Sequence, residues 1–178
     1  MRKLTHKELL DQRQTSEDAL KSTRHPISIV LDNIRSSYNV GSVFRSSDSA
    51  LVEEVLLCGF TPAPPRKEVH KTALGADESV PWRYFATTLE AIEYKKKQGS
   101  KIVALELTEN AKGYSDLSKE DFPLCIVVGN EISGISDEVL ALCDFAIEIP
   151  MYGVKHSLNV SVSAGIAIYE AVRIWKSF

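Results

Sequence analysis

Cysteine is scarce in this sequence of 178 residues. The three cysteines, Cys58, Cys125 and Cys143, are odd in number and widely spaced, so they match neither a disulfide framework nor a zinc signature. We expect buried, reduced thiols. Because no cluster of His and Cys residues has the spacing of metal ligands, no metal ion is expected either.

Long apolar runs are missing as well. No segment approaches the roughly 20 consecutive apolar residues that cross a bilayer, and the opening MRKLTHKELLDQRQ lacks the apolar stretch of a signal peptide. The formal net charge is −3, so no overall positive field favours nucleic acid, and any RNA binding must depend on local basic patches. We expect a cytoplasmic protein that does not bind membranes.

Apolar runs of strand length alternate with helical patterns along the chain. This alternation is typical of a parallel sheet covered on both faces. The expected fold class is therefore α/β, a parallel sheet with helices on both faces, in which residues 26–178 form one domain and residues 1–25 an N-terminal helical extension. Strands are expected at 27–31, 53–60, 101–107, 124–128 and 145–149, and helices at 39–51, 88–99, 136–143 and from about 162 onward.

Ligands of such sheets usually bind beyond the carboxyl ends of the strands. This rule selects the loops after Leu31, Leu105, Val128 and Ile149. Polar side chains in these loops are the first candidates for a functional site.

The first of these loops begins the segment DNIRSSYNVGSVFR. Asn39 is a suitable N-cap for the helix that follows, Gly41 leaves room for a ligand, and Arg45 offers a planar fork of donors that suits phosphate. A capped helix whose arginine makes a surface ion pair would produce the same pattern. For these residues alone, that simpler interpretation is favoured.

Gly129 and Gly134 bracket Glu131 in VVGNEISGIS, directly after an apolar strand. The Gly-Lys-Ser/Thr ending of a triphosphate-binding loop is absent, so nucleoside triphosphate hydrolysis is not supported. The segment is either a ligand-binding loop or a tight turn with a solvated glutamate.

The last loop contains KHSLNVSVSAG. His156 beside Ser157 is compatible with a serine hydrolase, but adjacent residues rarely reach hydrogen-bond geometry and no G-x-S-x-G elbow is present. For Ser157 and Asn159 alone, the simpler interpretation that they cap the final helix is favoured.

Taken together, three segments resemble the ordered motifs of the SpoU (TrmH) family of the SPOUT superfamily, which are S-adenosylmethionine-dependent RNA ribose 2′-O-methyltransferases. These segments are the Asn39–Arg45 spacing, GNEISGIS at 129–136 and IPMYGVKHSLNVSVSAG at 149–165, and the resemblance covers residues 27–175. It implies a deep C-terminal trefoil knot and a homodimer with its sites close to the subunit interface.

The resemblance also implies roles for individual residues. Arg45 would anchor the substrate phosphate and stabilise developing negative charge. The rest of the catalytic network would be Asn39, Glu131, Ser157 and Asn159. The cofactor S-adenosylmethionine would bind at Leu107, Gly129, Ile149, Met151 and Leu158, where Gly129 leaves room for adenosine.

An RNA partner would meet basic residues near this site. The candidates are Arg35, Arg66, Lys67, His70 and Lys71, most of them in a proline-rich basic loop expected at 61–71. The Lys95–Lys97 run is interpreted more simply as a solvated helix face.

The leading hypothesis is methylation of a ribose 2′-hydroxyl in tRNA, because LGADESVPWRYFATTLEAI and the last motif most resemble enzymes that modify a D-loop guanosine. Alternatives within the family are an rRNA target and the wobble ribose of tRNA. From other classes, a non-catalytic RNA-binding module on the same fold stays open, and a hydrolase that uses Ser157 is disfavoured.

Overall fold

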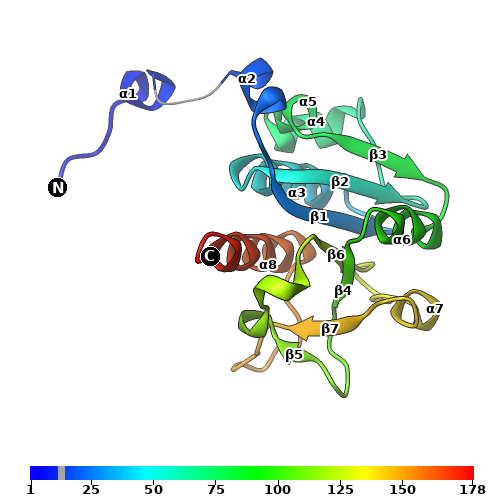
Figure 1. The fold of residues 1–178 in the computed structure, drawn as a ribbon. Coiled ribbons are helices and arrows are strands. Elements are labelled where there is room, and N and C mark those ends of the chain that lie inside the picture. Colours follow the sequence, from blue (N-terminus) through cyan, green and yellow to red (C-terminus); the bar gives the residue numbers. More distant parts are fainter. Residues whose placement is uncertain (12–14) are drawn as a thin grey trace.

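The computed structural model describes residues 1–11 and 15–178. They form a seven-stranded sheet in the order β3-β2-β1-β6-β4-β7-β5, in which all neighbouring strands run parallel (Figure 1). The strands are β1 His25–Asp32, β2 Val52–Cys58, β3 Trp82–Phe85, β4 Lys101–Leu105, β5 Lys112–Gly113, β6 Leu124–Val128 and β7 Phe145–Glu148.

Helices cover both faces of the sheet, which confirms the predicted α/β class. One buried apolar cluster joins the sheet to α3, α4, α5 and α8, and a second joins its other face to α6 and α7. The helices are α1 His6–Asp11, α2 Ser16–Lys21, α3 Ser37–Ser49, α4 Lys67–Ala73, α5 Ala76–Ser79, α6 Thr88–Lys97, α7 Asp137–Leu140 and α8 Val160–Trp175, with 3-10 turns η1 Tyr114–Asp116 and η2 Lys119–Asp121.

The strand alternation explains these two clusters. In β1, Ile29 and Leu31 face the α3 and α8 side, while Val30 faces the α6 side. Successive side chains of a strand point to opposite faces, so a strand in the middle of the sheet must be apolar throughout. The sequence pattern does not reveal β3 or β5, because β3 is a short edge strand with half-exposed side chains and β5 has only two residues.

The start of α3 differs from the prediction. Ser36 is its N-cap, and the Ser36 hydroxyl accepts the N–H of Asn39 at 3.3 Å, so the prediction of Asn39 as the cap is wrong. Gly41 serves helix packing rather than ligand approach. A Cβ at this position would overlap the Val69 carbonyl and the Thr72 hydroxyl of α4.

The basic segment predicted as a loop is partly helical. Arg66 is the N-cap residue of α4, and Lys67 and Lys71 lie within that helix. Val69 and Ala73, four residues apart, are buried on one side of α4, which explains why this short basic segment folds as a helix against the core.

The N-terminal residues form two short helices. Thr15 caps α2 by accepting the N–H of Asp18 at 3.1 Å. Figure 1 shows α1 apart from the sheet, and residues 12–14 of the expected extension lie outside the described residues. The division at residues 25 and 26 stays a prediction, and β1 begins at His25.

The three cysteines are free thiols, as predicted. Cys58 and Cys125 are buried, whereas Cys143 is only half-buried. Burial raises the pKa of Cys58 to about 12 and that of Cys143 to about 11. Among the helices of the described residues, none has the length and apolar character required to cross a membrane.

Lys95 corrects the interpretation of the 95–97 run as solvated. Its side chain is 1% exposed, and its Nζ donates to Glu53 at 2.8 Å and to Glu54 at 3.0 Å on β2. Burial opposes ionisation, but the two carboxylates raise the pKa of Lys95 above its ordinary value. Lys96 and Lys97 are exposed, because they lie on the opposite side of α6.

We expect Lys95→Met to destabilise the protein by about 3 kcal/mol, because it breaks a buried ion pair and leaves the Glu54 carboxylate paired with the exposed Arg83 at 3.2 Å in place of a buried cation. Urea unfolding followed by circular dichroism measures this change. Lys97→Met is the matched control and should change the free energy of unfolding by less than about 0.5 kcal/mol. Equal stability of the two variants would contradict a buried ion pair at Lys95.

Candidate active site

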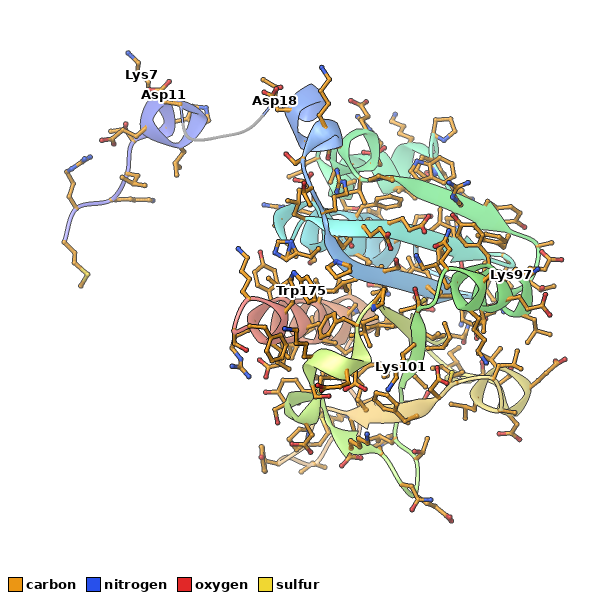
Figure 2. All side chains as sticks on the ribbon, in the orientation of Figure 1. Lys7, Asp11, Asp18, Lys97, Lys101 and Trp175 are labelled. Carbon is orange, nitrogen blue, oxygen red and sulfur yellow. The ribbon has the colours of Figure 1, made fainter. Side chains whose placement is uncertain are left out.

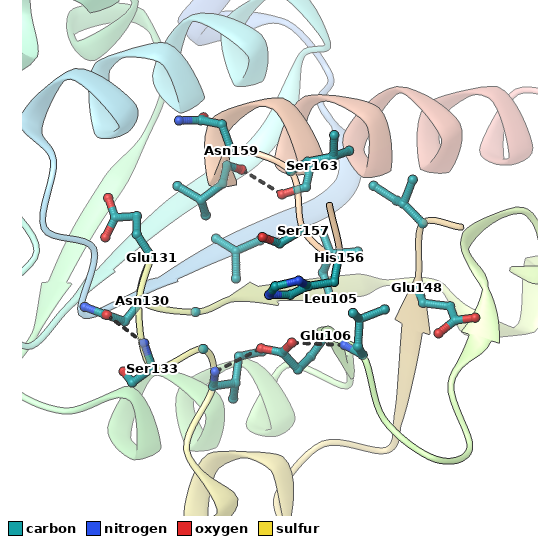
Figure 3. A pocket seen from close by; sticks show the side chains of 18 of the residues that line it. Leu105, Glu106, Asn130, Glu131, Ser133, Glu148, His156, Ser157, Asn159 and Ser163 are labelled. Atoms are coloured by element: carbon teal, nitrogen blue, oxygen red, sulfur yellow. Dashed lines mark hydrogen bonds between the residues drawn. The ribbon is translucent and has the colours of Figure 1, made fainter. Parts of the chain in front are cut away.

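A cavity of about 590 Å³ opens at the carboxyl ends of β4, β6 and β7 (Figure 3). Its walls come from the loops after Leu105, Val128 and Ile149, which are three of the four predicted loops. The fourth loop, after Leu31, adjoins the cavity through hydrogen bonds to Glu131. The sequence rule therefore selected the correct edge of the sheet.

All five residues expected at the cofactor line this one cavity. They are Leu107, Gly129, Ile149, Met151 and Leu158. The structure explains the glycine at position 129 differently from the sequence, which predicted that it leaves room for adenosine. A Cβ there would overlap the backbone of Gly134 and Ile135, so the glycine lets the 129–135 loop fold back on itself.

Glu131 is anchored at the amino end of α3. Its carboxylate accepts the N–H of Arg35 at 2.8 Å and of Ser36 at 3.1 Å, and the side-chain amide of Asn39 at 2.8 Å. Partial burial opposes ionisation, but these donors lower the pKa of Glu131 below its ordinary value. The positive end of the helix dipole acts in the same direction. Glu131 stays exposed to solvent, as the interpretation of a solvated glutamate requires, but its carboxylate is also fixed to α3.

Asn159 connects this network to the last helix. Its Oδ1 accepts the N–H of Ser161 at 2.9 Å and caps α8, while its Nδ2 donates to Oδ1 of Asn39 at 3.1 Å. Asn159 is therefore both a cap and a network residue. Asn39, Glu131 and Asn159 form a continuous chain of side-chain hydrogen bonds from α8 to the 129–135 loop.

Two residues of this site were missed from the sequence. Asn130 donates to the carbonyl of Asn33 at 2.7 Å and accepts the N–H of Ile132 at 2.9 Å, so it joins the β6 loop to the β1 loop. Glu106 accepts the N–H of Ile135 at 3.1 Å and faces the cavity. Glu106 follows β4 directly, and the rule that selected Glu131 could have found it.

Arg45 does not line this cavity. It is exposed on α3 and lines a second groove, of about 830 Å³, between α3, α4 and α8. Among the described residues, its guanidinium has no hydrogen-bond or ion-pair partner. The alternative of a surface ion pair is therefore wrong, and the five donors of Arg45 are available to an anion.

Ser157 and His156 both line the cavity and are exposed. In the described part of the chain, no hydrogen bond joins the His156 ring to the Ser157 hydroxyl. The activated serine that a hydrolase requires is therefore missing from this geometry. Across the same described residues, no group of three or more His, Cys, Asp or Glu side chains is arranged to hold a metal ion.

The residues expected to contact RNA are exposed on the α3 and α4 side. Arg66 and Lys67 lie at the start of α4, and Lys71 lines the second groove together with Arg45. The side chain of Arg35 is exposed beside the first cavity, where its backbone N–H binds Glu131.

Comparisons of the sequence and of the structure with known proteins both lead to one protein family. Residues 26–169 match the model of the SpoU rRNA Methylase family. The tRNA (guanosine(18)-2′-O)-methyltransferase of Escherichia coli (strain K12) is 33% identical over 147 residues, which cover 83% of this chain and 63% of that protein.

Two solved structures share the fold. The A. aeolicus TrmH/SpoU tRNA modifying enzyme superimposes with a TM-score of 0.80 at 27% identity, covering 96% of this chain and 84% of that one. The AdoMet-bound rRNA methyltransferase from Sinorhizobium meliloti has a TM-score of 0.79 at 25% identity, covering 87% and 59%.

The matched region covers most of this chain but a smaller share of several relatives, which are longer. The chain spans 57% to 63% of the length of several curated relatives that it matches. The family model nevertheless covers both motif-bearing loops of the cavity and the whole of α3. On this evidence the chain belongs to the SpoU rRNA methylase family.

Proposed function

We propose that this protein is an S-adenosylmethionine-dependent RNA methyltransferase that acts on a ribose 2′-hydroxyl, in tRNA and at a D-loop guanosine. In this proposal residues 26–178 are the methyltransferase domain, residues 1–25 an extension, and the protein acts in the cytoplasm. The relative from Escherichia coli (strain K12), whose name is tRNA (guanosine(18)-2′-O)-methyltransferase, supports the choice of tRNA.

One observation carries the proposal. The cavity that gathers all five expected cofactor residues is joined, through Asn159, Asn39 and Glu131, to the amino end of the helix that bears Arg45. The methyl donor would thus bind in the cavity and the RNA phosphate at Arg45, and the hydrogen-bonded network would hold these two neighbouring sites in a fixed arrangement. Positioning of this kind accounts for a large share of catalysis in bimolecular reactions.

The cavity fits the cofactor in size and chemistry. About 590 Å³ is ordinary for a small-molecule site, and Leu107, Ile149 and Leu158 provide apolar surface for an adenine ring. When bound, S-adenosylmethionine supplies an electrophilic methyl group on a sulfonium ion.

The chain's own residues would prepare the ribose hydroxyl. The Arg45 guanidinium binds the adjoining phosphate and stabilises negative charge that develops on the 2′-oxygen. The guanidinium stays protonated, so a substrate phosphate accepts the hydroxyl proton as the oxygen–methyl bond forms. Ser157 orients the ribose, and the Asn39, Glu131 and Asn159 network holds α3 in place.

We further propose a homodimer and a C-terminal trefoil knot. The second groove carries exposed apolar side chains, Leu74, Val162 and Tyr169, beside Arg45, and a second copy of the chain would cover them. The segment between β7 and α8 returns across the β4 and β6 loops before α8 packs on α3 and β1, which is compatible with a knotted path.

Methylation of RNA transcripts with labelled cofactor, followed by nuclease mapping and nucleoside mass spectrometry, tests this function. We expect label on a ribose 2′-oxygen of tRNA at a D-loop guanosine. Label at the wobble ribose or in rRNA would replace the proposed substrate, and label on a base would overturn ribose methylation. Cofactor binding and RNA binding without transfer would identify a non-catalytic RNA-binding module.

The position of Lys71 beside Arg45 leads to a second prediction. Lys71→Ala should weaken tRNA binding severalfold and lower the slope of log affinity against log salt by about one, because one phosphate contact is lost. Filter binding across a salt series measures both quantities. The control is Lys97→Ala, since Lys97 projects from α6 on the opposite face of the sheet (Figure 2). An unchanged slope for Lys71→Ala would exclude it from the RNA surface.

A further inference from the structure

The cofactor cavity has an uneven distribution of charge. Three carboxylates line it, from three different segments of the chain: Glu106 in the loop after β4, Glu131 in the loop after β6 and Glu148 as the last residue of β7. Among its described lining residues there is one imidazole, His156, and neither lysine nor arginine. Only Glu131 belongs to the network that holds α3.

Glu106 is held in place facing the cavity. One oxygen accepts the N–H of Leu107 at 3.0 Å and the other accepts the N–H of Ile135 at 3.1 Å (Figure 3). Gly134, at φ +66°, makes room for this carboxylate, because a Cβ there would lie 2.5 Å from Oε2 of Glu106. Both oxygens thus act as acceptors, and each keeps a lone pair for a further partner.

Glu148 is half-buried at the other side of the cavity (Figure 3). Within the part of the chain that the structure describes, its carboxylate has no hydrogen-bond or ion-pair partner. Burying a carboxylate partly without a nearby cation costs folding free energy. A carboxylate at such a position is therefore a candidate for binding a charged ligand.

The positive groups nearby do not balance this charge. The amino end of α8 borders the cavity, but a helix dipole is equivalent to only about half a unit charge. Arg45 lines the second groove instead, and Arg35, although exposed beside the cavity, is not among the residues that line it. The charged side chains that line the cavity are therefore mainly carboxylates.

We propose that Glu106 and Glu148 make this cavity selective for the positively charged methyl donor over its neutral product. The inference rests on the proposed function. S-adenosylmethionine carries a sulfonium, an ammonium and a carboxylate, a net charge of +1. When the S–CH₃ bond breaks, its electron pair stays on sulfur and the thioether product, S-adenosylhomocysteine, is neutral overall. The cavity would then lose part of its attraction as soon as transfer is complete, which favours product release.

Calorimetric titration with three ligands tests this selectivity. The ligands are S-adenosylmethionine, S-adenosylhomocysteine and sinefungin, which carries an amine in place of the methylsulfonium and is also cationic. The proteins are the wild type, Glu106→Gln, Glu148→Gln and the control Glu109→Gln, whose exposed side chain follows the same strand but does not line the cavity. A pH of about 8 keeps an ordinary imidazole neutral.

We expect each cavity variant to raise the dissociation constants of S-adenosylmethionine and sinefungin about tenfold, equivalent to about 1.4 kcal/mol of binding free energy. The dissociation constant of S-adenosylhomocysteine should change less than about twofold. The control should leave all three affinities unchanged. A uniform loss for all three ligands would show that Glu106 and Glu148 merely shape the cavity, and unchanged affinities would exclude any role; either result overturns this inference while the proposed function stands. If the wild type binds none of the ligands, the proposed function fails, and the inference fails with it.

Discussion

Arg45→Ala is expected to lower the rate of methyl transfer to tRNA by about a thousandfold, while the dissociation constant of S-adenosylmethionine stays within about twofold of the wild-type value. The separation of effects follows from the structure. Arg45 lies in the second groove and touches none of the cofactor cavity, so its loss removes a phosphate anchor without changing the cavity wall. Single-turnover transfer of labelled methyl groups and calorimetry measure the two quantities.

Two further variants sharpen this prediction. Arg45→Lys keeps the charge but not the planar fork, so we expect an intermediate rate. The control is Arg173→Ala, which removes another exposed arginine, one that pairs with Glu170 on α8. This variant should transfer methyl groups at the wild-type rate. Persistent transfer by Arg45→Ala would contradict the assignment of Arg45 as the phosphate anchor.

Glu131→Gln is expected to lower methyl transfer about a hundredfold and the stability at neutral pH by about 1 kcal/mol, since the hydrogen bonds of this exposed carboxylate are partly replaced by water. The carboxylate accepts three hydrogen bonds, from Arg35, Ser36 and Asn39. A glutamine presents an N–H₂ group toward these donors, so at least one of them loses its acceptor and the amino end of α3 shifts. Transfer assays and urea unfolding measure the two effects.

The stability effect of Glu131→Gln should also depend on pH. The pKa of Glu131 in the folded protein is lower than its ordinary value of 4.5. The charged form therefore stabilises the fold above that value, and the contribution is lost as the pH falls through the folded pKa. The difference in Tm between wild type and variant should be largest near neutral pH and should shrink as the pH falls below 4.5 and through the lower pKa of the folded state. A difference that is constant with pH would show that the Glu131 charge does not hold α3.

The fold was predictable where apolar patterns are continuous. The runs at 27–31 and 124–128 became β1 and β6, which pair in the middle of the sheet, because a strand buried on both faces must be apolar at every position. The edge strand β3 has no such requirement and left no clear pattern. The segment 61–71 was predicted as a loop because it is rich in proline and in basic residues, and Val69 is its one residue that docks α4 on the core.

The candidate site was predictable from where polar residues follow strands. Glu131 and Asn159 were selected for that reason, and both lie at the predicted edge of the sheet. For Asn39 the residue pattern indicated only a cap, and the family resemblance alone placed it in the network, because its role as a bridge depends on Glu131 and Asn159, which are 92 and 120 positions away. Roles in catalysis and cofactor binding stay predictions until the variants are measured.

By itself the sequence determined the α/β class, the edge of the sheet that carries the cavity and the polar residue types there, because hydrophobic periodicity and residues after strands are local features. Only the tertiary structure decided which groups meet. It directed Arg45 into a separate groove, buried Lys95 against β2 and placed Glu106 and Glu148 in the wall of one cavity. These outcomes depend on how each helix rotates and packs on the sheet and on how the loops fold over one another, and such long-range contacts leave no local pattern.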